Sequence, residues 1–128
     1  MKDKEDNIKS EGKFKKPNIQ ILSEFYSKHH IGGKRRNQSV SEEKRSKLFK
    51  KWIGTNKKVL DMGCRDGVLT RHFIEQNEVT GLDIDKIALK TCNENLNIET
   101  VWADFSLQIP LPTSSFDVVI AGEVIEHL

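Results

Sequence analysis

The 128-residue chain has few cysteines and no long hydrophobic run, and both features limit the classes of protein to which it can belong. Two cysteines, Cys64 and Cys92, make neither a disulfide framework nor a Cys-x-x-Cys metal pair, so a reducing, cytoplasmic setting is expected. No apolar run approaches the ~20 residues of a membrane span. The polar start at residues 1–7 has no hydrophobic stretch behind it, so we expect no secretory signal.

Charge is unevenly distributed, although the formal net charge is only +2. Residues 1–58 hold 17 Lys and Arg against 7 Asp and Glu, whereas residues 59–128 hold 4 against 12. We expect residues 1–17 to be a disordered basic leader, followed by an N-terminal helical segment over 18–56. The basic part is interpreted either as a solvated leader or as a segment that binds nucleic acid.

Two helices are predicted in the basic part. The first covers Asn18–His29, with a buried side formed by Ile19, Leu22, Phe25 and Tyr26. After a glycine-containing loop over 30–37, Ser39 and Glu42 fit a capping box, and Ser41 is a competing N-cap. The second helix is predicted to run to about Ile53, with four apolar side chains buried: Leu48, Phe49, Trp52 and Ile53.

From Lys57 onward, strand and helix patterns alternate. Predicted strands are 58–62, 78–83, 97–103 and 116–121, and helices are expected over 68–76 and from Asp85 or Lys86 to Asn95. Strands that alternate with helices predict an α/β fold with a doubly wound, Rossmann-like parallel sheet. In such sheets ligands bind beyond the carboxyl ends of the strands.

Each predicted strand ends close to a carboxylate. Asp61 begins the glycine turn Asp-Met-Gly-Cys-Arg-Asp-Gly, whose glycines let main-chain N–H groups approach a ligand. Asp83 lies 22 residues further on, where a carboxylate is placed to accept from ribose hydroxyls. Asp85 is available to cap the next helix instead. Asp104 and Phe105 follow the third strand, and Glu123 follows the fourth.

The residues that end or directly follow each of the four strands are called the strand exits. Together these four exits resemble class I S-adenosylmethionine-dependent methyltransferases of the small-molecule, type 11 branch. The matching motifs are Asp61-x-Gly63-Cys64-x-x-Gly67, Gly81-Leu-Asp83-Ile84, Ala103-Asp104-Phe105 and Phe116-Asp117 through Leu128. The resemblance covers about 57–128 and implies strand order 3-2-1-4, with the chain truncated before the last three strands. It therefore implies a partial cofactor-binding domain, inactive on its own.

The resemblance also implies site residues, with S-adenosylmethionine as the cofactor. The glycine turn, including Gly63, Cys64, Arg65 and Gly67, would hold the methionine part, with Asp61 near its ammonium group. Asp83 would bind the ribose, and Ile84, Asp104 and Phe105 would contact the adenine. Ala121 would line the sulfonium end. The implied acceptor is a small molecule, although its identity stays open, and nucleic acid is an alternative partner through the basic segment.

Other features qualify these assignments. The family usually has glycine where this chain has Arg65, so we expect that side chain to point to solvent. His127 is either a general base or a structural residue at a helix start. Cys64 is expected to pack rather than react. A non-catalytic module that retains the fold is the alternative function, whereas Gly63-x-x-x-Gly67 disfavours a dinucleotide site. No metal site is predicted.

Overall fold

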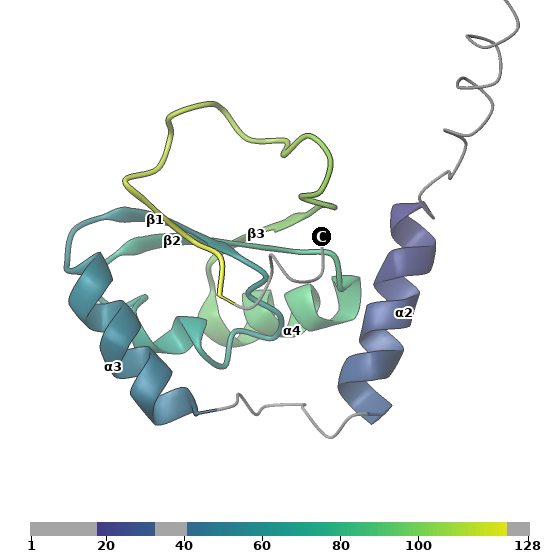
Figure 1. Cartoon of the computed structure of the whole chain (residues 1–128), viewed down its shortest axis with the longest axis horizontal. Coiled ribbons are helices and arrows are strands. Elements are labelled where there is room, and N and C mark those ends of the chain that lie inside the picture. Colours follow the sequence, from purple (N-terminus) through teal and green to yellow (C-terminus); the bar gives the residue numbers. More distant parts are fainter. Residues whose placement is uncertain (1–17, 33–40, 123–128) are drawn as a thin grey trace, which may run out of the picture.

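The computed structural model describes residues 18–32 and 41–122, and Figure 1 draws the rest of the chain as a grey trace. The basic leader expected at 1–17, the capping residue Ser39 and the predicted acceptor-side His127 therefore lie outside the described residues. Among the described helices, none is long and apolar enough to cross a bilayer.

A four-stranded parallel sheet forms the centre of the domain. Its strands are β1 (Lys58–Met62), β2 (Glu78–Asp83), β3 (Glu99–Trp102) and β4 (Val118–Ile120), in the order β3-β2-β1-β4. All three neighbouring pairs are parallel. The predicted strand order 3-2-1-4 and the Rossmann-like fold are confirmed, while β3 and β4 are shorter than expected.

Alternate residues of the strands enter separate hydrophobic clusters, because successive side chains point to opposite faces of a sheet. Val59 packs with Ile53 at the end of α3 (Glu42–Ile53), with Phe73 and with two residues of the neighbouring strands, Val79 of β2 and Ile120 of β4. Leu60 packs on the other face with Leu82 and Ala103. Figure 1 shows α3 and α4 (Lys86–Leu96) on one side of the sheet and the β3–β4 segment arching over the other. Burial on both faces explains why β1 and β2 are apolar without strict alternation.

Helix α4 (Lys86–Leu96) follows the prediction closely. Asp85 caps it, accepting a hydrogen bond from the Ala88 N–H over 3.1 Å. The helix buries Leu89 and Cys92, and it ends at a residue in the left-handed conformation, Asn97. Asp85, rather than Asp83, is therefore the N-cap of α4.

Helix α3 (Glu42–Ile53) packs on the domain through Phe49 and Ile53, as predicted, whereas the predicted burial of Leu48 and Trp52 is wrong. Leu48 is 44% exposed and Trp52 is 66% exposed, whereas Ser46 and Ile53 are buried. The buried positions lie along an i, i+3, i+7 stripe through Phe49, which is half-buried. Ser41 precedes the helix in a left-handed conformation and makes no side-chain cap hydrogen bond, so its predicted capping role is wrong.

Helix α2 (Ile19–Gly32) extends beyond the predicted end at residue 29. Its most buried side chains are two serines four residues apart, Ser23 and Ser27. Phe25 was predicted on the buried side but is 63% exposed. Hydrogen bonds to the start of α4 orient α2: the Lys86 N–H donates to Ser23 Oγ, and Ser27 Oγ donates to Asp85 Oδ1. Of the other predicted positions, Ile19, Leu22 and Tyr26 are half-buried on the same side as the serines, so polar contacts and the predicted apolar side chains share the packed face.

The helix predicted over 68–76 is wrong. The structure has one short 3₁₀ turn, η1 (Thr70–His72), flanked by turns. Asn77 accounts for part of the difference, because its Nδ2 donates to the carbonyls of Phe73 (3.0 Å) and Gly54 (3.1 Å). A continuing α-helix would bond the Phe73 carbonyl to the main-chain N–H of residue 77 instead.

Candidate functional site

The carboxyl ends of the strands meet at one edge of the sheet. Asp61 of β1 is in register with Ile120 of β4 on one side and with Gly81 of β2 on the other. Asp83 of β2 is in register with Trp102 of β3. The segments that leave the strands therefore start beside one another, as the parallel order predicted.

The glycine turn after β1 is a tight main-chain structure fixed to β2. The N–H groups of Gly63 and Cys64 both donate to the Leu82 carbonyl, over 2.7 and 3.3 Å. Gly63 and Gly67 have φ of 80° and 85°, values that side-chain-bearing residues rarely adopt. A Cβ on Gly67 would lie 2.9 Å from Cys92 Sγ and 2.6 Å from Leu96 Cδ1, so α4 packs directly on the turn.

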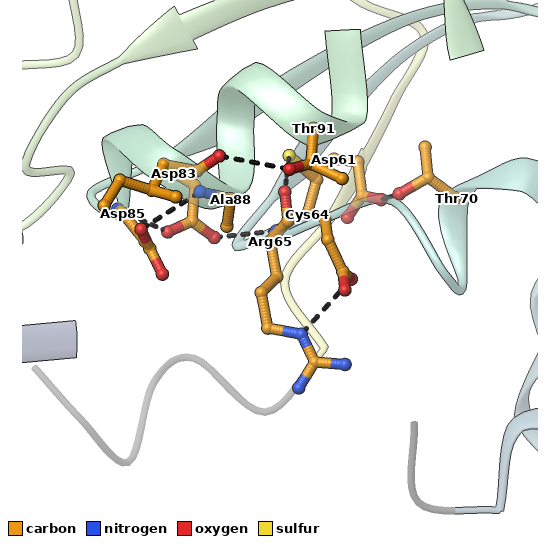
Figure 2. Close-up of polar contacts among 10 residues, drawn as sticks. Asp61, Cys64, Arg65, Thr70, Asp83, Asp85, Ala88 and Thr91 are labelled. Atoms are coloured by element: carbon orange, nitrogen blue, oxygen red, sulfur yellow. Dashed lines mark hydrogen bonds and ion pairs between the residues drawn. The ribbon is translucent and has the colours of Figure 1, made fainter. Parts of the chain in front are cut away.

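Arg65, at the tip of this turn, also has a positive φ of 53°. This conformation explains why glycine suits the position in the family pattern, and it costs an arginine free energy. The side chain is 17% exposed, and its Nε lies 3.4 Å from the buried Asp66 carboxylate. The expectation that Arg65 points to solvent is therefore wrong: the guanidinium is partly buried and paired (Figure 2).

Asp83 is held by the main chain on both of its oxygens. Oδ2 accepts from the Arg65 N–H and Oδ1 accepts from the Asp85 N–H, each over 2.8 Å (Figure 2). The side chain is 6% exposed. Two N–H donors stabilise an ionised carboxylate and fix its orientation. Because a carboxylate offers about four acceptor positions, this geometry is compatible with further donors from a ligand.

Asp61 is buried beside the glycine turn, and its Oδ2 accepts a hydrogen bond from the Thr70 hydroxyl over 2.7 Å. Burial raises the pKa of Asp61 to about 7, and the neighbouring Asp83 charge adds to the increase. The Thr70 hydrogen bond and the positive charge of Arg45 oppose it. Sequence reasoning missed Thr70 and Arg45; the signal for Thr70 was obscured by the expected helix over 68–76.

Ile84 follows Asp83 and is half-buried. Its carbonyl accepts from the indole Nε1 of Trp102 over 2.9 Å, and Lys86 Nζ lies 4.5 Å from the Trp102 ring centroid. The last residue of β3 thus fixes the main chain that follows β2. Trp102 is a third residue that the sequence did not indicate, since an aromatic residue in a strand is typical of any sheet.

Asp104 and Phe105 leave β3 in different environments. Asp104 Oδ1 accepts from the N–H and the hydroxyl of Ser106, over 3.0 and 2.6 Å. Phe105 is partly buried against the cluster of Leu60, Leu82 and Ala103. Asp104 therefore organises the loop, and Phe105 packs on the hydrophobic core at its edge.

After β4, Ala121 is exposed and Gly122 is half-buried. A Cβ on Gly122 would lie 3.0 Å from Arg45 Nη2 and 3.2 Å from Phe49 Cζ, so α3 lies against this segment. The remaining acceptor-side residues of the fourth motif, including His127, are outside the described part of the chain.

The two cysteines are both buried and free. Cys64 packs with Leu89 and Cys92, and its Sγ would lie 2.7 Å from a Cβ on Gly81. A hydrogen bond with Cys92, together with burial, raises the pKa of Cys64 well above its usual value. A neutral, enclosed thiol is a packing group, in agreement with the prediction. Within 18–32 and 41–122, no group of three or more His, Cys, Asp or Glu is arranged to hold a metal.

A family model described as a methyltransferase domain matches residues 59–128, more than half of the chain. The chain belongs to this methyltransferase family. The match includes the glycine turn and the exits of all four strands, and the resemblance to class I S-adenosylmethionine-dependent methyltransferases is confirmed. The methyltransferase domain is thus the part of the chain that contains the carboxyl-edge site.

Curated relatives are similar over more than half of this chain. A ribosomal protein L11 methyltransferase of Neisseria gonorrhoeae is 37% identical over 83 residues, which are 60% of this chain and 28% of that protein. An uncharacterized methyltransferase of Schizosaccharomyces pombe is 30% identical over 79 residues, covering 59% of this chain and 30% of that protein. The chain thus spans less than a third of the length of these relatives.

Solved structures support the fold of the methyltransferase domain. A TehB-like SAM-dependent methyltransferase from Corynebacterium glutamicum aligns with a TM-score of 0.61 and 24% identity, over 85% of this chain and 59% of that one. Coclaurine N-methyltransferase, solved with N-methylheliamine and SAH, aligns with a TM-score of 0.53 and 22% identity, over 61% of this chain and 26% of that one. At these identities the likeness supports the fold alone.

Proposed function

We propose that this methyltransferase domain binds S-adenosylmethionine at the carboxyl edge of its sheet and takes part in methyl transfer to an acceptor. The observation that carries the proposal is the Asp83 carboxylate, buried and fixed by two main-chain N–H groups beside the glycine turn. A carboxylate at the end of the second strand, about 20 residues beyond such a turn, is positioned to bind ribose hydroxyls.

The adenosine part is assigned to the exits of β2 and β3. Asp83 accepts hydrogen bonds from the ribose hydroxyls, and Ile84 lies against the adenine. The Trp102 hydrogen bond to the Ile84 carbonyl supports this assignment, because it fixes the main chain of the segment that follows β2. Asp104 accepts from the adenine amine, and Phe105 lies beside the ring at the edge of the core.

The methionine part is assigned to the turn over 63–67. Gly63 carries no Cβ, so a ligand can approach the main chain closely at the end of β1. The N–H groups of Gly63, Cys64 and Arg65 are already bonded to Leu82 and Asp83, so they fix the shape of the turn. Cys64 and Arg65 contribute through their main chain, since the thiol is enclosed in the core and the guanidinium pairs with Asp66. Asp61 lies near the ammonium group, and Ala121 lines the sulfonium end.

Bound S-adenosylmethionine supplies a methyl group activated by its sulfonium charge. The residues of this chain contribute by holding and orienting the ligand, which is a large part of the catalysis of a displacement between two bound groups. Asp83 and the glycine turn are suited to that task because hydrogen bonds within the protein already fix them. His127 is proposed as the group that removes a proton from the acceptor, since imidazole titrates near neutral pH.

Three classes of acceptor are proposed for the whole protein, each from a separate observation. The family resemblance supports a small molecule, whereas the name of the Neisseria gonorrhoeae relative supports a protein acceptor. The excess of Lys and Arg over residues 1–58 keeps nucleic acid as a third class. Transfer of labelled methyl groups to separated small-molecule, protein and RNA fractions distinguishes these classes, because only the true class gains label.

Calorimetric titration of the full chain with S-adenosylmethionine, S-adenosylhomocysteine and NAD⁺ tests the cofactor assignment. We expect saturable binding of the first two ligands and none of NAD⁺. A folded chain that binds neither adenosyl ligand would contradict the proposal. The replacement of a glycine by Arg65 motivates the alternative of a non-catalytic module, which binding without transfer to any of the three acceptor classes would support.

A further inference from the structure

Helix α3 directs one cationic side chain toward the carboxyl edge of the sheet. Arg45 is half-buried, while its neighbours Lys44 and Lys47 are exposed. Its Nη2 would lie 3.0 Å from a Cβ placed on Gly122, the second residue after β4. The guanidinium therefore lies beside the main chain that leaves β4, on the site side of the helix.

Arg45 also acts on the residue that ends the buried part of β1. Its positive charge lowers the pKa of Asp61, against the effect of burial. Asp61 is in register with Ile120, two residues before Gly122, so the two observations place the guanidinium in the same region. This region lies between the exits of β1 and β4, next to the glycine turn.

One contact of Arg45 itself and two contacts of helix α3 fix this position. The Phe49 ring lies 5.8 Å from the guanidinium carbon, within reach of a cation–π interaction. At the start of the helix, the Glu42 carboxylate binds Arg71 and lies 2.7 Å from His72 Nε2, so α3 is joined to η1. At its end, Ile53 is part of the core.

We propose that Arg45 and Asp61 form a pair that recognises the α-amino acid group of the ligand, with Arg45 binding its carboxylate and Asp61 its ammonium. This assignment rests on the proposed function and adds a binding residue from the N-terminal helical segment. A guanidinium binds a carboxylate through two parallel N–H groups, and the positive charge of the ligand's ammonium would favour the ionised form of Asp61 beside it. Helix α3 is then part of the binding site.

The experiment compares two ligands that differ only in the amino acid part. S-adenosylhomocysteine carries it, whereas 5′-methylthioadenosine has a methyl group in its place. We expect Arg45→Met to weaken S-adenosylhomocysteine binding by about 10- to 100-fold, the range for a charge-assisted hydrogen bond, and to leave 5′-methylthioadenosine within about twofold. Lys44→Met, which removes one charge from the exposed side of the same helix, should change neither affinity.

Three results would overturn the assignment. Equal weakening of both ligands would make Arg45 a structural residue, and unchanged binding of both would exclude it from the site. If the wild-type chain bound neither ligand, the proposed function itself would fail, and the assignment with it. Should Arg45→Met not fold, Arg45→Lys keeps the charge but loses the paired N–H groups, and it should weaken S-adenosylhomocysteine alone; parallel weakening of both ligands would again contradict the assignment.

Discussion

The main-chain N–H of Arg65 donates to the Asp83 carboxylate over 2.8 Å, so one hydrogen bond joins the tip of the glycine turn to the end of β2. The other carboxylate oxygen accepts from Asp85, the N-cap of α4. One buried carboxylate therefore sets the position of the turn, the β2 exit and the helix start relative to one another. The site depends on this junction more than on any single glycine.

Asp83→Asn should weaken both the fold and the site. An amide has one oxygen, so its NH₂ group would face one of the two N–H donors. We expect the free energy of unfolding to fall by about 1–3 kcal/mol and S-adenosylhomocysteine binding to fall by at least about tenfold. Urea unfolding and calorimetry measure the two effects.

Asp117→Asn is the matched control. Asp117 Oδ2 accepts from the Lys58 N–H over 2.8 Å at the opposite end of the sheet, and its side chain is exposed. This variant should leave the affinity unchanged. Equal affinity losses in the two variants would show that Asp83 acts only through stability.

Asp61 should make the stability of the chain depend on pH. Its pKa is 3.8 when unperturbed and about 7 in the folded chain, so the native state binds more protons between these values. The free energy of unfolding therefore falls as pH rises from about 4 to about 7, by on the order of a few kcal/mol, and then levels off. Asp61→Asn keeps an oxygen that can accept from Thr70 and should remove this contribution.

Urea unfolding of the wild type and of Asp61→Asn at pH 5, 6, 7 and 8 gives the difference between their free energies of unfolding. The effects of the other titrating groups cancel in this difference, which leaves the contribution of Asp61. The stability of Asp61→Asn relative to wild type should rise with pH across this range. A constant difference would mean that the carboxyl group is already ionised at pH 5.

Gly67→Ala should be more harmful than Gly54→Ala. Both glycines have positive φ, so either substitution carries the backbone strain of about 1 kcal/mol. A Cβ at Gly67 would also overlap Leu96 and Cys92, whereas a Cβ at Gly54 has nothing within 4 Å. Overpacking adds about 1–3 kcal/mol at Gly67 alone. If Gly67→Ala and Gly54→Ala unfolded at the same midpoint concentration of urea, the close packing of α4 on the turn would be refuted.

Ser27→Ala should loosen α2 without unfolding the sheet. The variant loses the buried hydrogen bond from Ser27 to Asp85, while the Asp85 carboxylate still caps α4 by accepting from the Ala88 N–H. We expect faster amide exchange in α2 and unchanged exchange in β1 and β2. Glu24→Gln, at an exposed position of the same helix, is the control; a uniform increase along the whole chain would contradict local docking.

The sheet was predictable from the sequence because the apolar residues of the strands and the alternation of strands with helices indicate the same fold. Val59 and Leu60 lie in a run that is buried on both faces, and the alternation of strands with helices leaves few parallel topologies. Asp61, Asp83 and Asp104 were found because each comes directly at or after a strand. Their shared edge follows from parallel pairing alone.

The helices were harder to predict because contacts distant in sequence decide which face packs. Trp52 fits an amphipathic pattern, yet the half-buried side of α3 is the one with Arg45 and Phe49. In α2, Ser27 is buried in place of Phe25, since Asp85 lies 58 residues away and no local pattern signals it. The buried, paired side chain of Arg65 likewise depends on the fold of its own turn.

The central claim is that the exits of the four strands form one adenosyl-binding site, and amide chemical shifts measured during titration with S-adenosylhomocysteine test it most directly. We expect the saturating shifts to concentrate at residues 61–67, 83–85 and 103–105 and at Ala121, with little change on the exposed side of α3. Shifts confined to one strand exit, or located at the opposite end of the sheet near Lys58 and Asp117, would contradict the account.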